Sequence, residues 1–578
     1  MTTAFPRARH IELSLAGADE AISAETRARA EGSAALLIDA ANLSAPLVAQ
    51  VPGTAAKIES GAVVPLAHAA MIEVWRARDG AEACLDEDGS RTGGIVPLLC
   101  PSSPRGRLEL ARATAEAAQR GDAIVLDGID RWYAQEPSAA GHCPHCERAL
   151  VEALRVSYGE QLQPFSAFEL SRRAGGPAHE RPFAGMRLST RLAEPLAAVR
   201  AAVLAARDSA RKSRGAEIAV FARTGPLSAL ALASARHLDG LIFALPSTDP
   251  QEALLPLLSA RAALGERAAI AELPAGARPD EVRLLAALAT ACDVDVLLPP
   301  AASDDARAAL LAHRRFAALL RERYRPTAPV ADVELIISPA SDHLSAGTHL
   351  RASSAAVSAI ARAQLQLSVR LDTQAPGRDG PRLLLLAGAQ ALPDSLAPAL
   401  RRHVESGGDL LLIGQCDRVD EENRVLGPLF PSAKPGLERI GEGRVFSLAG
   451  PADPFVAQSF TQLDGAIQRA LRELLGRTQR TLSISGRGNL WTRAYLDSER
   501  KLDVHLVNLE LREGGFIPAQ GMLLQIAGAA AGAGRTGYWF SPERGGKDGE
   551  KIALNPSGFS VSTVLPTVSA SALLSIPR

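Results

Sequence analysis

Four apolar runs in the middle of the chain decide its fold class: AEIAVFAR (216–223), GLIFALPS (240–247), RAAIAELPA (267–275) and VDVLLPP (294–300). Each run is hydrophobic almost throughout instead of alternating with polar residues, which is typical of strands buried on both faces of a parallel sheet. Segments of helical length follow the second and third runs, at 250–264 and 279–291, and each begins with proline. The pattern therefore predicts repeated strand–helix units.

The same alternation extends toward the N-terminus and predicts a closed barrel. Earlier runs of strand length are ALLIDAANL (35–43), GAVVPLAHA (61–69), GGIVPLLCP (93–101) and DAIVLDGID (122–130). Further helices are expected at 107–120, 195–214 and 304–324. Eight strand–helix units of this kind are typical of a (β/α)8 TIM barrel, which we expect to occupy residues 1–325.

Strands and helices continue to alternate after a proline-containing linker at 325–329. The expected strands are VELIISP (333–339), RLLLLAG (382–388) and GDLLLIG (408–414), with helices at 353–365 and 395–406. This order predicts a flavodoxin-like α/β domain over residues 330–450. Because no glycine-rich phosphate loop joins a strand to a helix there, we expect no nucleotide cofactor.

The last hundred residues have a different pattern. Beyond one more helix, expected at 463–475, the chain contains only short strands separated by turn residues, such as KLDVHLVNLEL (501–511) and GFSVSTVLP (558–566). The pattern predicts a C-terminal β-sandwich over residues 480–578.

Charge and composition exclude several classes of partner. The 578 residues include 63 Lys and Arg against 64 Asp and Glu, a net charge of −1, so we expect neither a nucleic-acid partner nor an anionic membrane surface. No apolar run approaches the roughly 18–20 residues of a membrane span, and none resembles a signal peptide, so a cytoplasmic protein is expected. Six cysteines in so long a chain do not form a disulfide framework.

Four passages resemble the glycoside hydrolases related to family forty-two β-galactosidases, and especially the little-characterised relatives of those enzymes. One passage runs from Trp75 through Asp79-Gly80 and Asp88-Gly89 to LCPSSP (99–104). Another is the run ending at Asp127-Gly128, followed by HCPHC (142–146). The remaining two are the leucine-rich segment that ends in VESGG (404–408) and the strand VHLVN (504–508).

The resemblance implies a glycosidase that acts on a carbohydrate with two carboxylates at the barrel mouth. In that clan the nucleophile ends the seventh strand and the acid/base ends the fourth, which places these roles on Glu272 and Asp127. Asp130 is the alternative acid. The resemblance also implies that residues 330–450 correspond to the β-galactosidase trimerisation domain and form a homo-oligomer.

Further side chains are expected to bind the substrate. Asp39 ends the first predicted strand and would bind sugar hydroxyls. Trp132 and Tyr133 follow the fourth strand, and Trp75 lies between the second and third predicted strands; aromatic rings of this kind pack on the apolar face of a pyranose. With Asp130, these residues complete the predicted site.

Two features leave a second interpretation open. Family forty-two carries Asn-Glu at the acid/base position, where this chain reads Leu126-Asp127-Gly128. Aromatic residues make up only 4% of the chain, which is few for a sugar site. The alternative is a catalytically degenerate barrel that acts as a carbohydrate-binding or assembly protein.

The cysteine pair in HCPHC (142–146) raises the question of a metal. Ligands so close together cannot all reach one tetrahedral ion, so a zinc site would need further donors, for which Cys100 and Cys84 are the candidates. The other interpretation is that Cys143 and Cys146 pack against the barrel or pair within the loop. We expect no bound metal and no other cofactor.

Overall fold

The structure is a computed structural model that describes part of the chain. It describes the backbone of residues 12–15, 35–38, 47–49 and 67–73, and residues 99–120, 123–132, 143–158, 184–215, 217–299, 302–321, 328–345, 347–374, 380–414, 416–419, 425–430, 435–449, 463–475, 480–496, 501–513, 515–527, 535–543 and 548–577.

Seven strands form the first sheet in chain order: β3 (Leu47–Ala49), β4 (Ala67–Glu73), β5 (Ala123–Asp127), β6 (Ala219–Pro226), β7 (Gly240–Ala244), β8 (Ala268–Glu272) and β9 (Asp295–Leu297). Strands β4 to β9 are parallel, and β3 pairs antiparallel with β4. The apolar runs from β5 to β9 are therefore strands, as the sequence predicts.

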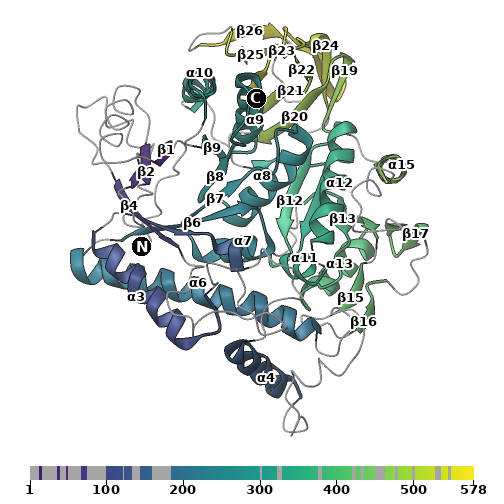
Figure 1. The fold of residues 1–578 in the computed structure, drawn as a ribbon. Helices are drawn as coiled ribbons and strands as arrows, with labels where there is room; N and C mark the ends of the chain where they lie inside the picture. The colour runs from purple at the N-terminus through teal and green to yellow at the C-terminus, as the bar shows by residue number, and fades with distance from the viewer. Residues whose placement is uncertain are drawn as a thin grey trace.

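Helices connect these strands and cover the sheet (Figure 1): α3 (Pro104–Arg120), α4 (Pro144–Tyr158), α6 (Ala184–Arg214), α7 (Ala229–Ser234), α8 (Pro250–Leu264), α9 (Pro279–Ala291) and α10 (Asp304–Arg321). The start of α8 shows why a helix begins where it does. Pro250 occupies the first turn, where no backbone N–H is needed, and the Asp249 carboxylate accepts the N–H of Gln251 at 2.8 Å. Both signals are present in the sequence.

The N-terminal part of this sheet differs from the prediction. The strand expected at 35–43 is β2 (Ala35–Ile38), which pairs with β1 (Glu12–Leu15) in a separate two-stranded parallel sheet. The run at 61–69 corresponds to β4, which begins later, at Ala67, and pairs directly with β5. Among the described residues, β3 and β9 are the edges of a seven-stranded sheet, so a closed ring of eight is not seen there.

The third expected strand, 93–101, does not lie beside β5. Its described residues, 99–101, contribute one bridge residue and the start of a turn. Residues 93–98 lie outside the described residues.

The second sheet has the strand order β12 (Leu367–Leu371), β11 (Val333–Ile337), β13 (Leu383–Ala387), β14 (Asp409–Ile413), β18 (Gly443–Leu448) and β17 (Gly436–Ile440). The first five strands are parallel and follow the flavodoxin-like order 2-1-3-4-5, while β17 is an antiparallel edge. Helices α11 (Pro339–Leu344), α12 (Thr348–Arg362), α13 (Leu396–Glu405) and α15 (Asp464–Leu475) belong to this unit (Figure 1).

Two antiparallel sheets form the C-terminal unit. One has the order β10 (Ala328–Pro329), β20 (Leu490–Leu496), β21 (Leu502–Asn508), β29 (Ser571–Ile576), β25 (Thr536–Phe540) and β26 (Glu550–Ala553); the other has β19 (Leu482–Arg487), β24 (Gln520–Ala527), β28 (Ser560–Val564) and β27 (Asn555–Ser557). Side chains from both sheets share one buried core that includes Val504, Leu524 and Trp539. This is the packing expected of two layers of strands.

The three units are in contact with one another. Helix α12 of the second unit packs beside α8 of the first (Figure 1). The Tyr495 hydroxyl of β20 donates to the Ala291 carbonyl at the end of α9, at 2.7 Å. None of the helices that the structure describes is long and apolar enough to cross a membrane.

Candidate functional site

The carboxyl ends of β5, β6 and β8 bring three charged side chains together. Arg223 of β6 donates to Glu272 through Nε at 3.1 Å and through Nη2 at 3.0 Å. Its Nη1 lies 3.5 Å from Oδ1 of Asp127. The two carboxylates that the sequence analysis singled out, one at the end of β5 and one at the end of β8, therefore contact the same guanidinium.

The register of the sheet explains why the three side chains meet. Asp127 and Arg223 are partners across β5 and β6, and Arg223 is the partner of Ile242 in β7. Ile242 in turn is the partner of Ile270 in β8. Partner residues in a parallel sheet share a face, and the face repeats every two residues, so Glu272 lies on the same face as Arg223.

The cluster is partly buried and electrostatically coupled. The side chains of Glu272, Asp127 and Arg223 are 13%, 20% and 26% exposed. Burial by itself lowers the pKa of Arg223, but the charges of Glu272 and Asp127 and their hydrogen bonds outweigh burial and raise it. Arg223 is therefore a permanent cation, and it compensates one of the two negative charges.

Asp130 lies beside this cluster. It belongs to the 3-10 helix η2 (Ile129–Trp132), which follows β5 directly. The N–H of Gly128 donates to the Arg223 carbonyl at 2.9 Å, which holds this turn against β6. A Cβ atom at Gly225 would lie 2.8 Å from Oδ2 of Asp130, so glycine at that position allows the carboxylate to approach the end of β6.

The remaining predicted site residues cannot be compared with the structure. Asp39, Trp75 and Tyr133 lie outside the described residues, as does the side chain of Trp132. Their roles stay predictions.

Two positions at the same edge were missed from the sequence. Arg223 was overlooked because a basic residue at the end of an apolar run has no obvious partner until the register places Asp127 beside it. Glu73, the last residue of β4, is the register partner of Asp127, but the strand was expected to end at residue 69. A search for every charged residue at a strand end would have found both.

Three buried cysteines, Cys100, Cys143 and Cys146, form a second cluster. The Sγ atom of Cys100 lies 3.3 Å from that of Cys143 and 3.4 Å from that of Cys146, separations too long for a disulfide bond. The sequence predicts Cys100 as a possible additional donor for this pair, and the structure places its thiol beside Cys143 and Cys146. Within the described ranges this is the one group of His, Cys, Asp and Glu side chains with the spacing of metal ligands.

The donor chemistry of the cysteine cluster fits a thiophilic ion. Three thiolates and a fourth ligand are a common set for tetrahedral zinc. Cys143 begins the turn that leads into α4, and Cys100 precedes α3, so an ion here would join two loops at the edge of the first unit. Such a site would be structural.

Comparison with known proteins gives no match to a family model and none to a curated protein sequence. Solved structures do match over nearly the whole chain. The β-galactosidase from Bacillus circulans sp. alkalophilus has a TM-score of 0.62 at 12% identity, covering 96% of this chain and 91% of its own. The α-L-fucosidase isoenzyme 2 from Paenibacillus thiaminolyticus has a TM-score of 0.57 at 14% identity, covering 96% and 89%.

A third match supports the same relation. The β-galactosidase from the Antarctic haloarchaeon Halorubrum lacusprofundi has a TM-score of 0.58 at 14% identity, covering 95% of this chain and 91% of its own. At such low identity the likeness concerns the fold. The chain therefore shares the overall fold of these glycoside hydrolases.

Proposed function

We propose that the chain is a glycoside hydrolase whose reactive groups are Asp127 and Glu272, held at the mouth of a barrel. The observation that carries this proposal is the position of both carboxylates on one face of the first sheet, at the ends of β5 and β8, on either side of Arg223. A glycosidase needs two carboxyl groups facing one bond, and strand ends are where a barrel presents them.

The reach of Arg223 supports a closed barrel. β8 lies two strands away from β6, which is roughly 10 Å in a flat sheet. The Arg223 guanidinium nevertheless binds Glu272 with two nitrogen atoms while also contacting Asp127 on the other side. A sheet curved toward this face brings those groups together, and we infer that it continues into a TIM barrel followed by the flavodoxin-like domain and the β-sandwich.

The unequal contacts of Arg223 suggest different roles for the two carboxylates. Glu272 is held by two nitrogen atoms, which fixes its orientation and suits a carboxylate that remains ionised as nucleophile or base. Arg223 reaches Asp127 through a single nitrogen atom at 3.5 Å, a longer contact that a substrate could replace. Once substrate excludes water and separates Asp127 from Arg223, the protonated form is favoured.

In the proposed reaction Asp127 gives its proton to the glycosidic oxygen as the bond to the anomeric carbon breaks. The departing sugar leaves with a new hydroxyl group. Glu272 either forms a bond to the anomeric carbon, which water later hydrolyses, or removes a proton from the attacking water. In each case one water molecule is consumed for each bond cleaved, and Asp127 recovers its proton.

A second candidate is a carbohydrate-binding or assembly protein without turnover. The same Arg223 contact favours it, because one guanidinium already engages both carboxylates. A fold shared with hydrolases does not decide between a catalytic and a non-catalytic barrel.

Turnover and binding assays on the same protein separate the two candidates. The purified chain is assayed with nitrophenyl glycosides and natural oligosaccharides, and binding is followed by calorimetry. For a hydrolase, Glu272→Gln and Asp127→Asn each reduce kcat by orders of magnitude while binding survives. Glu217→Gln, an exposed carboxylate just before β6, is the matched control. Saccharide binding without turnover in the unmodified protein would establish the second candidate instead.

A further inference from the structure

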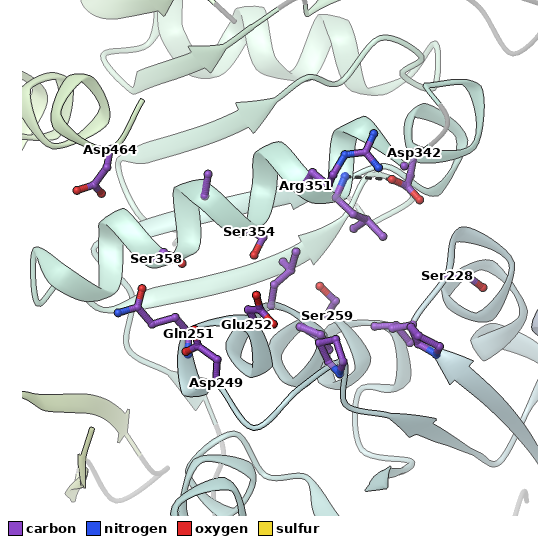
Figure 2. A pocket seen from close by; sticks show the side chains of 18 of the residues that line it. Ser228, Asp249, Gln251, Glu252, Ser259, Asp342, Arg351, Ser354, Ser358 and Asp464 are labelled. Carbon is purple, nitrogen blue, oxygen red and sulfur yellow. Dashed lines mark hydrogen bonds between the residues drawn. The ribbon is translucent and has the colours of Figure 1, made fainter. Parts of the chain in front are cut away.

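A cavity separate from the Asp127–Arg223–Glu272 cluster lies between the first and second units. Its volume is about 910 Å³, within the range of small-molecule sites. Helix α8 forms one wall and α12 forms the other, and Figure 2 shows their side chains facing one another across the space. We call it the α8–α12 cleft.

The cleft opens at the carboxyl side of the first sheet. Pro226 ends β6, and Pro246 follows β7; both line the cleft. Arg223 is on the same strand as Pro226, three residues earlier, so the cleft begins next to the proposed reactive site. From the second unit, helix α11, which follows β11, contributes Asp342.

Arg362, one of the basic side chains that line the cleft, is already paired with an acidic residue. Arg362 binds Asp464 of α15 at 2.7 Å and also donates to Gln251 at 2.7 Å. Arg351 lies beside Asp342, where its charge partly offsets the burial that raises the pKa of that carboxyl to about 6. The Asp342 carboxylate also accepts the N–H of Leu350 at 3.0 Å, the dashed line in Figure 2.

Two carboxylates of α8 remain without a cation. Asp249 is used only to cap the helix through the N–H of Gln251, and Glu252 accepts the Ser247 hydroxyl at 2.5 Å. Among the residues the structure describes, neither has an ion pair with Lys, Arg or His. The wall formed by the start of α8 therefore carries negative charge, which attracts a cation and repels phosphate.

Hydroxyl groups line the rest of the cleft. Ser259 of α8 is fully buried, and its Oγ has no hydrogen-bond partner in the described part of the chain. Ser354 and Ser358 lie opposite on α12, as Figure 2 shows. A buried hydroxyl without a partner is costly, and a ligand hydroxyl in the cleft would remove that cost. Leu255, Leu350 and Ala355 provide apolar surface between these groups.

We propose that the α8–α12 cleft binds an amino sugar, a hydroxyl-rich molecule with a protonated amine. The ammonium group would pair with Asp249 and Glu252, and the sugar hydroxyls would bond to Ser259 and the serines of α12. This site is additional to the proposed reactive site and uses none of its residues.

The structure also explains why a nucleotide is a poor alternative. In a flavodoxin-like sheet the usual ligand crevice lies between the carboxyl ends of β11 and β13. Here the hydroxyls of Ser338 and Ser341 both donate to the Ala391 carbonyl in that position. His349 fills the adjacent space, with Nε2 accepting the Ser338 N–H at 2.9 Å and Nδ1 donating to the Ala387 carbonyl at 2.6 Å.

The test is calorimetric titration of the full-length protein with glucosamine oligomers and with their N-acetylated counterparts. The amine form should bind at least tenfold more tightly, and added salt should weaken its binding. Asp249→Asn combined with Glu252→Gln should reduce that affinity at least tenfold, because asparagine still caps α8 while both charges are lost. Ser259→Ala should also weaken binding of the amine form, and Glu217→Gln is the control.

Three results would overturn the proposal: no binding, equal binding of the N-acetylated form, or unchanged affinity in the double variant. Asp127→Asn and Glu272→Gln distinguish this site from the reactive one, because both variants should bind glucosamine oligomers as the unmodified protein does. Binding of glucosamine oligomers in the cleft does not depend on the reactive-site proposal, so it stands even if that proposal fails.

Discussion

The Arg223 guanidinium spans β7 to bind the Glu272 carboxylate, with Nε and Nη2 at 3.1 and 3.0 Å from its oxygens. This pair joins two strands that are not neighbours in the sheet, and it also reaches Asp127. Removing the cation leaves two carboxylates close together and mostly buried.

The first prediction concerns that cation. Arg223→Met should lower the free energy of unfolding by about 3 kcal/mol, because breaking a largely buried pair leaves its carboxylate uncompensated. Arg223→Lys retains the charge and loses the two-nitrogen contact, so its loss should be smaller. Urea denaturation of the three proteins measures the difference. An Arg223→Met protein as stable as the unmodified one would show that the bridge contributes nothing.

The second prediction tests the packing between β6 and β7. A Cβ atom at Gly240 would lie 2.5 Å from the Phe221 ring and 2.9 Å from the Ala268 carbonyl oxygen. Gly240→Ala should therefore destabilise the fold by about 1–3 kcal/mol. Gly276→Ala is the matched control, since no atom lies within 4 Å of its added Cβ, and its effect should stay within about 0.5 kcal/mol. Equal melting temperatures for the two variants would contradict the β6–β7 contact.

The third prediction concerns pH. Burial lowers the pKa of His349 to about 4, although its bond to the Ala387 carbonyl acts in the opposite direction. The unfolded chain binds a proton on this ring near pH 6.5, whereas the folded chain does so only near pH 4, so acid favours the unfolded state between those values. His349→Gln should be most destabilising at pH 7, and its disadvantage should shrink by up to about 3 kcal/mol by pH 4. Denaturant titrations at pH 7, 6 and 5 measure how the difference in free energy of unfolding between the two proteins changes with pH. A difference that stays constant would contradict the prediction.

The fourth prediction concerns the three thiols. If Cys100, Cys143 and Cys146 hold zinc, the purified protein should contain close to one equivalent by atomic spectroscopy, and chelation should lower its melting temperature. Cys146→Ser should lose the metal, while Cys416→Ser, at a buried cysteine outside the cluster, should retain it. Metal-free protein that also fails to bind added zinc would mean that the thiols pack without an ion, the second interpretation of the sequence.

The fifth prediction is a homo-oligomer formed through residues 330–450, which rests on the resemblance to the trimerisation domain. Light scattering at micromolar concentration should give a multiple of 60.6 kDa. Leu437→Glu, at a half-exposed leucine on the edge strand β17, tests whether this face takes part, because a charge there should weaken an apolar contact. A monomer at all concentrations would reject the prediction.

Sequence reasoning worked where the local signal was strong. The strands β5 to β9 are continuous apolar runs, and α8 and α9 begin at the prolines that mark them. It missed β12, because LSVRL follows α12 after a short turn and could be mistaken for the end of the helix. It did not predict β17 and β18, which lie in a stretch rich in glycine and proline (427–454).

The candidate site was only partly accessible from the sequence. Asp127 and Glu272 could be named because each is an acidic residue that ends an apolar run. Arg223 could not be assigned, because its partners depend on which strands are neighbours and on their register. The α8–α12 cleft depends on helices from two units that are 84 residues apart at their nearest ends, and no local pattern reports such packing.

Hydrogen-bonded polar residues fill the space at the carboxyl ends of β11 and β13 and limit how the second unit can be engineered. Ser338, Ser341 and His349 satisfy the Ala387 and Ala391 carbonyls from inside, so each of them is part of a mutually dependent set. Grafting a flavin-binding loop here would require replacing them together, since His349 and the Ser341 hydroxyl each hold buried backbone groups at this edge. New chemistry is more readily introduced at the α8–α12 cleft, where about 910 Å³ of space already exists.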